Sequence, residues 1–148
     1  MGKTYYQGKY VPSNPSKYRG DPSNIIYRSS WERKAMRYLD MKESVESWGS
    51  EELSVPYISP EDGKTHRYFP DLVAKVKLPD GTHQCFMFEI KPMRQCVEPT
   101  KPSKPGRRYA MEMRKWAVNL AKWKAAKEFC DSHGWKFVVL TEKELNIR

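Results

Sequence analysis

Three apolar segments separated by two turn signals fill the middle of this sequence and constrain its fold more than any other feature. The segments are 52–57 (ELSVPY), 66–77 (HRYFPDLVAKVK) and 84–91 (QCFMFEIK), with PEDG at 60–63 and LPDG at 78–81 between them. Clusters of Pro, Asp and Gly of this kind are typical of tight connections between antiparallel strands. The apolar density of 84–91 predicts a central strand, and Pro92 ends it because proline cannot donate a hydrogen bond to a sheet.

Helical patterns flank these predicted strands. Ser29-Ser30-Trp31-Glu32 matches an S-x-x-E capping box and predicts a helix over 31–41. A Pro- and Lys-rich loop of 16 residues follows at 92–107, and apolar residues then recur at helical spacing over 109–132. Residues 135–140 (WKFVVL) predict a last strand. The resulting αβββαβ order predicts an α/β domain with one mixed sheet flanked by helices.

The first 28 residues predict an extended basic arm ahead of a single folded domain at 29–148. Gly and Pro punctuate this segment, Lys and Tyr are interspersed, and no apolar period is sustained. Such a segment cannot bury enough surface to fold alone. It therefore either drapes over the domain or becomes ordered on a partner. Its tyrosines either stack on bases or pack against the surface of the domain.

The net charge of +9 is unevenly distributed along the chain. Residues 1–30 carry +4, residues 31–90 carry −3 and residues 91–148 carry +8. Two basic flanks around an acidic middle favour a polyanionic partner, of which nucleic acid is the commonest. The alternative is that the excess of Lys and Arg only promotes solubility. An RNA-binding module is disfavoured because the sequence has no RRM or KH signature.

Several other classes of protein are excluded. No stretch approaches 18 apolar residues and no signal peptide is recognisable, so we expect a cytoplasmic protein without a membrane span. Cys85, Cys96 and Cys130 show no C-x-x-C spacing and no histidine at zinc spacing. This pattern predicts reduced cysteines rather than a disulfide framework or a structural zinc site.

The strongest chemical signal is Pro70-Asp71 followed by Glu89-Ile90-Lys91. Side chains alternate along a strand, so Glu89 and Lys91 project from one face. If the preceding strand is adjacent, Asp71 can approach Glu89. Two carboxylates that lie close together raise each other's pKa unless a cation lies between them. The set favours a hard divalent cation such as Mg²⁺, with Mn²⁺ as a substitute.

A metal held by Asp71 and Glu89 can polarise a phosphodiester and lower the pKa of a bound water. Lys91 can orient that water or stabilise charge in the transition state. The basic flanks can hold the phosphate backbone. The residues therefore predict metal-dependent hydrolysis of nucleic acid.

These motifs resemble those of the PD-(D/E)xK nuclease superfamily. Pro70-Asp71 matches its PD, and Glu89-Ile90-Lys91 matches its E-x-K. The resemblance implies a restriction-endonuclease-like core in αβββαβ order. It also implies that Glu32, on the first helix, reaches the metal site with Asp71 and Glu89. The alternative for Glu32 is that it only completes the capping box with Ser29.

A narrower resemblance covers most of the chain, from about Lys9 to Leu140. Segments 27–32 (YRSSWE), 66–71 (HRYFPD) and 88–92 (FEIKP) are similar to those of the head completion nucleases of T-even-type tailed phages. The arrangement also resembles the TnsA transposase endonucleases, which have Gln where Glu89 stands.

The narrower resemblance implies a Mg²⁺-dependent DNA endonuclease that acts on the packaged genome end at the portal. It implies double-stranded DNA and other phage head completion proteins as partners, in the cytoplasm of the infected bacterium or in the head–neck region of the virion. Two alternatives are a non-catalytic DNA-binding head protein and a transposon-type nuclease that cleaves ends.

Basic and polar residues outside the motifs are candidate contacts for DNA. They are Lys101, Lys104, Arg107 and Arg108 near the Pro-rich loop, Lys115 and Asn119 on the long helix, and Arg67 before the PD motif. We expect the loop to lie beside Lys91 and clamp the DNA. The alternative for the helix is an ordinary solvated face, and Asn119 either contacts the site or satisfies a buried polar group.

Overall fold

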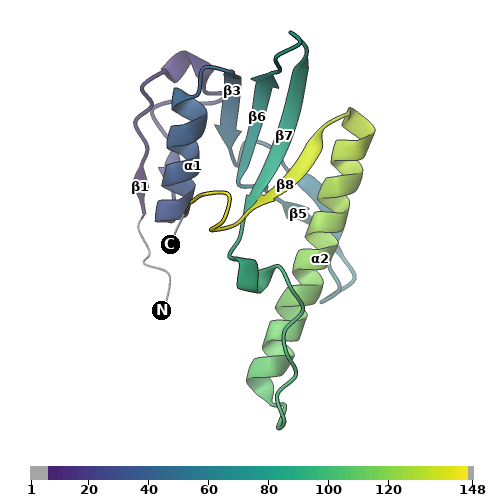
Figure 1. Cartoon of the computed structure of the whole chain (residues 1–148). Coiled ribbons are helices and arrows are strands. Elements are labelled where there is room, and N and C mark those ends of the chain that lie inside the picture. Colours follow the sequence, from purple (N-terminus) through teal and green to yellow (C-terminus); the bar gives the residue numbers. More distant parts are fainter. Residues whose placement is uncertain (1–6, 147–148) are drawn as a thin grey trace.

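A four-stranded mixed sheet separates two helices in the computed structural model, which describes residues 7–146 (Figure 1). The strands are ordered β3 (Val45–Ser50), β6 (Leu72–Lys77), β7 (His83–Ile90) and β8 (Lys136–Leu140). β6 is antiparallel to both of its neighbours, and β8 is parallel to β7. Helix α1 (Ser30–Met41) covers one face and helix α2 (Arg107–His133) the other. The predicted α/β class with a restriction-endonuclease-like core is confirmed.

The helices form where the sequence predicts them. Glu32 donates its backbone N–H to Ser29 Oγ at 3.1 Å, so the N-terminus of α1 is capped as its S-x-x-E pattern indicates. Helix α2 ends at Gly134, whose φ of 70° places it in the left-handed region that favours glycine. Both helices lie within two residues of their predicted bounds.

The strand predictions for 52–57 and 66–77 need correction. The first strand of the main sheet is β3, which the sequence analysis missed. Residues 52–57 instead lead into β4 (Val55–Ile58), which pairs with β5 (Thr65–Tyr68) in a separate hairpin. Segment 66–77 is not one strand, because Pro70 interrupts it and divides β5 from β6.

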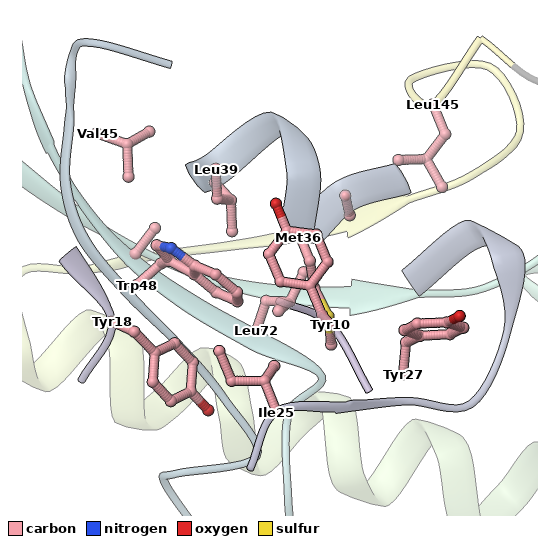
Figure 2. Close-up of a cluster of buried hydrophobic side chains, with 12 residues drawn as sticks. Tyr10, Tyr18, Ile25, Tyr27, Met36, Leu39, Val45, Trp48, Leu72 and Leu145 are labelled. Atoms are coloured by element: carbon pink, nitrogen blue, oxygen red, sulfur yellow. The ribbon is translucent and has the colours of Figure 1, made fainter. Parts of the chain in front are cut away.

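The N-terminal segment drapes over the domain, as one of the two alternatives predicted. Figure 2 shows Tyr10, Tyr18 and Ile25 around the fully buried Trp48 of β3. Both tyrosine rings make edge-on contacts with Trp48, with centroids 5.9 and 4.8 Å away. These tyrosines therefore belong to the core rather than to a base-stacking surface. Residues 1–6 of the predicted arm lie outside the described residues.

Local pairing and a buried carboxylate hold this segment in place. Strand β1 (Gly8–Lys9) pairs with β2 (Ile26–Tyr27), and the 3-10 turn η1 (Pro15–Lys17) lies between them. At the end of α1, the fully buried Asp40 accepts hydrogen bonds from the Tyr10 hydroxyl at 2.6 Å and from two backbone N–H groups, those of Ser13 at 2.7 Å and Asn14 at 3.0 Å. Asp40 thus connects the N-terminal segment to α1.

A second core lies on the face of the sheet that α2 covers. Its buried members are Val55, Tyr57, Tyr68, Met87, Ala126 and Cys130. The N-terminal half of α2 extends past the end of the sheet, alongside the segment that follows β7 (Figure 1). Neither helix of the described chain has the length and apolar composition needed to cross a membrane.

Candidate active site

Asp71 and Glu89 meet on the face of the sheet that α2 covers. In the register of β6 and β7, Leu72 pairs with Phe88, which sets Asp71 and Glu89 next to each other at the ends of adjacent strands. Asp71 Oδ2 accepts a hydrogen bond from the backbone N–H of Ile90 at 2.7 Å. The Glu89 carboxyl also lies close enough to Asp71 to raise its pKa. The break at Pro70 sets Asp71 directly before β6, where it faces Glu89.

Burial makes this pair of carboxyl groups electrostatically costly. Desolvation, and then the charge of Glu89, raise the pKa of Asp71 well above its usual value. Glu89 itself is only 8% exposed. Its Oε1 accepts a hydrogen bond from the Tyr68 hydroxyl at 2.6 Å, and its Oε2 lies 3.8 Å from Lys91 Nζ. Asp71, Glu89 and Lys91 are therefore brought together as their spacing on the strands predicts.

Glu32 combines the two alternatives considered for it. Its Oε1 accepts a hydrogen bond from the backbone N–H of Arg28 at 3.3 Å, so the side chain supports the start of α1. Its charge also acts on Asp71 and adds, after desolvation and the charge of Glu89, to the raised pKa of that carboxyl group. Glu32 is thus a helix-capping residue at the edge of the site.

An ion pair that the sequence analysis missed lies at the same edge. Arg28 pairs with Glu51, and the charges of Glu32 and Asp71 also act on the Arg28 guanidinium. Glu51 has a left-handed φ of 54°, and its N–H donates to the carbonyl oxygen of Asp71 at 3.3 Å. The position of Arg28 just before the capping box was the available signal. The ion pair adds a half-exposed cation beside the carboxylates.

The donor set fits a hard divalent cation. It offers only oxygen ligands, and a cation between Asp71 and Glu89 would relieve the repulsion that raises the pKa of Asp71. Within residues 7–146, no three Asp, Glu, His or Cys side chains converge as a ready-made metal cluster. The pair is sufficient for Mg²⁺, which commonly binds one or two carboxylates and completes its shell with water and phosphate oxygens.

Two of the predicted DNA contacts lie close to this site. Lys115 and Asn119 of α2 line a cavity of about 470 Å³ that Lys91 also lines. Lys122, which is not among the predicted DNA contacts, lines it too, and its ammonium lies 5.9 Å from the centre of the Tyr68 ring. The helical spacing of Lys115, Asn119 and Lys122 was the signal that could have grouped them.

The other predicted DNA contacts lie elsewhere. The loop expected beside Lys91 runs along α2, so that residues 101–108 lie at the far end of that helix (Figure 1). Arg107 is twelve residues from Asn119, about 18 Å along the helix axis. Lys101, Lys104, Arg107 and Arg108 are all exposed there. Arg67 of β5 donates to Ser54 Oγ at 3.0 Å, and strand alternation directs it away from the side of Tyr68.

The mixed sheet between two helices, with the PD and E-x-K residues on adjacent strands, defines the nuclease class that the motifs predict. The chain belongs to the TnsA-like endonuclease N-terminal family, whose model matches residues 42–142. It is also similar to the head completion nuclease of Enterobacteria phage T4, with 42% identity over 144 residues. That match covers 95% of this chain and 93% of the phage T4 protein. Both findings confirm the resemblances drawn from the sequence.

Proposed function

We propose that this protein is a metal-dependent DNA endonuclease that hydrolyses phosphodiester bonds during phage head completion. The observation that carries the proposal is the pair formed by the half-buried Asp71 and the buried Glu89, with Lys91 beside it. Membership of an endonuclease family and the similarity to a head completion nuclease support the same reaction and the same biological step. The proposed substrate is double-stranded DNA at the packaged genome end.

Each residue of the site has a distinct role in this proposal. Asp71 and Glu89 would hold Mg²⁺, which would polarise the scissile phosphate and lower the pKa of a bound water. Glu32 would contribute a third carboxylate from α1 through a water. Lys91 holds its ammonium near Glu89 Oε2, where it can orient the attacking water or stabilise charge in the transition state. Arg28 places a second cation where a substrate phosphate approaches.

The same comparison supports a proposed location and proposed partners. Because its relative is named a head completion nuclease, we place the protein in the infected host during assembly of the phage head. Its partners would be DNA and the portal or other head completion proteins. Mn²⁺ would replace Mg²⁺, because both are hard cations that accept carboxylate and water ligands.

A plasmid-nicking assay tests the proposed reaction. We expect nicking of supercoiled plasmid with Mg²⁺ or Mn²⁺ and none with EDTA. Lys91→Ala should lower the rate by about a hundredfold or more, because a charge that stabilises the transition state is lost. Exposed Lys64→Ala in the β4–β5 turn is the matched control and should cleave as the wild type does.

The same assay has two outcomes that would overturn the proposal. Equal cleavage by the wild type and by Lys91→Ala would assign the activity to a contaminant. DNA binding without cleavage in every metal would favour a structural DNA-binding head protein instead.

The hydrogen bond from Tyr68 to Glu89 provides a second test of the metal site. Tyr68→Phe removes the donor that orients Glu89, so we expect the Mg²⁺ concentration for half-maximal cleavage to rise by roughly ten- to a hundredfold. Tyr57→Phe is the matched control, because Tyr57 is in the same core and Lys122 also lies over its ring. If the two variants need the same Mg²⁺ concentration for half-maximal cleavage, Tyr68 does not position Glu89.

A further inference from the structure

A cavity of about 470 Å³ lies beside the carboxyl pair, between the segment that follows β7 and helix α2. Lys91 is part of its wall, so the cavity adjoins the candidate active site through this side chain. Residues from 91–99 form one side, and residues from 112–122 of α2 form the other. A group bound in this cavity would therefore lie next to the bond that is cleaved.

The charges around the cavity favour an anion. Four cationic side chains line it, those of Lys91, Arg94, Lys115 and Lys122. Only two carboxylates of the described residues line it, those of Glu61 and Glu112. In the described chain, only Lys91 among these four cations forms an ion pair within 4.0 Å. Three cations thus remain available for phosphate oxygens, for which lysine and arginine are the usual ligands.

The rest of the lining suits a nucleobase. Trp116 lines the cavity and is braced by an edge-on contact with Trp123, with ring centroids 6.3 Å apart. Tryptophan provides a flat surface for base stacking that tolerates any sequence. Asn119, one helical turn away, carries an amide that can both donate to and accept from a base edge.

The size of the cavity limits what it can hold. Pockets of about 300 to 1,000 Å³ enclose one small-molecule ligand, and 470 Å³ lies within that range. One nucleotide can occupy such a space, whereas a stretch of duplex can only lie across its mouth. A nucleotide can enter only if its strand is unpaired at that point.

We propose that this cavity binds one nucleotide of a single DNA strand next to the scissile phosphate. The phosphate lies among Arg94, Lys115 and Lys122, and the base stacks on Trp116. The enzyme then prefers DNA whose strands are separated at the cleavage site, such as a frayed end or a fork. This inference rests on the proposed function of the Asp71–Glu89 site.

A binding experiment tests the cavity without cleavage. A short single-stranded oligothymidylate is titrated in EDTA against the full chain, and tryptophan fluorescence is recorded. We expect quenching, and Lys115→Ala should weaken binding about tenfold, because a charged contact to phosphate is lost. Lys124→Ala, an exposed lysine on α2 outside the cavity, is the matched control and should bind as the wild type does.

Trp116→Phe separates stacking from charge in the same titration. The phenyl ring keeps an aromatic surface, so binding should persist while most of the quenching disappears. Absence of quenching in the wild type, or equal weakening by Lys115→Ala and Lys124→Ala, would overturn the proposal.

A cleavage experiment tests the substrate preference. The wild type is given a forked duplex and a fully paired duplex of the same sequence with Mg²⁺. We expect kcat/KM to be at least about tenfold higher on the fork, and Lys115→Ala to reduce that ratio. Equal rates on the two substrates would overturn the cavity proposal alone. Oligonucleotide binding without cleavage of either substrate would instead overturn the proposed nuclease function and leave the binding site standing.

Discussion

Asp71→Asn is expected to reduce DNA cleavage by about a thousandfold or more while the protein remains folded. The asparagine side chain is neutral, so the site loses one of the carboxylate charges that would hold the metal. A loss of roughly 4 kcal/mol of transition-state stabilisation corresponds to about three orders of magnitude in rate. The asparagine oxygen can still accept the hydrogen bond that Ile90 N–H donates to Asp71. The measurement is single-turnover cleavage of a labelled duplex.

The same variant should be at least as stable as the wild type when no metal is present. In the wild type, burial and the neighbouring Glu89 raise the pKa of Asp71, so its ionised form opposes folding at neutral pH. Asparagine removes that repulsion. We expect the free energy of unfolding in EDTA to be unchanged or higher, and Mg²⁺ to stabilise only the wild type.

Urea denaturation with EDTA and with Mg²⁺ measures both effects. Asp131→Asn, on an exposed position of α2, is the matched control and should keep wild-type activity and the wild-type response to Mg²⁺. Wild-type cleavage by Asp71→Asn would remove Asp71 from the site. Marked destabilisation of that variant in EDTA would contradict the electrostatic account.

Local signals were sufficient to predict the two helices and strand β7. The capping box starts α1, Gly134 ends α2, and the apolar run before Pro92 forms β7. Each of these depends on neighbouring residues and on general backbone chemistry. Strand β3 gave no such signal, because VESWGS has few strand-forming residues, and it pairs with β6 mainly through burial of Trp48.

The candidate site was partly predictable for the same reason. Alternation along β7 placed Glu89 and Lys91 together, and the pairing of β6 with β7 brought Asp71 to them. Continuous alternation through 66–77 would have put Tyr68 and Asp71 on opposite faces. The interruption at Pro70 removes that constraint, and Tyr68 contacts Glu89 from a different sheet. Contacts of this kind depend on tertiary packing, so no periodic pattern in the sequence predicts them.

Asp40→Ala is expected to lower the free energy of unfolding by about 3 kcal/mol. The substitution leaves three donors without their acceptor: the Tyr10 hydroxyl and the backbone N–H groups of Ser13 and Asn14. Hydrogen bonds to a charged group contribute roughly 1.5–3 kcal/mol each, and water can reach the two partly buried backbone groups, so the costs do not add fully. The melting temperature should fall by about 6–12 °C for a domain of this size. Tyr10→Phe, which removes one donor, should cost about 1.5 kcal/mol.

The pH dependence of this loss distinguishes a buried carboxylate from simple loss of packing. Burial raises the pKa of Asp40, but the hydrogen bonds from Tyr10, Ser13 and Asn14 outweigh it and hold the pKa below its usual value. Because the pKa of Asp40 is lower in the folded than in the unfolded chain, its carboxylate stabilises the fold at pH values above the unfolded pKa of about 3.9. This stabilisation is lost as the pH falls through the folded-state pKa. The difference in the free energy of unfolding between the wild type and Asp40→Ala, measured by urea denaturation, should thus be constant from about pH 5 to 8. It should become smaller below pH 4. A difference that stays the same down to pH 3 would mean that Asp40 acts through its volume rather than its charge.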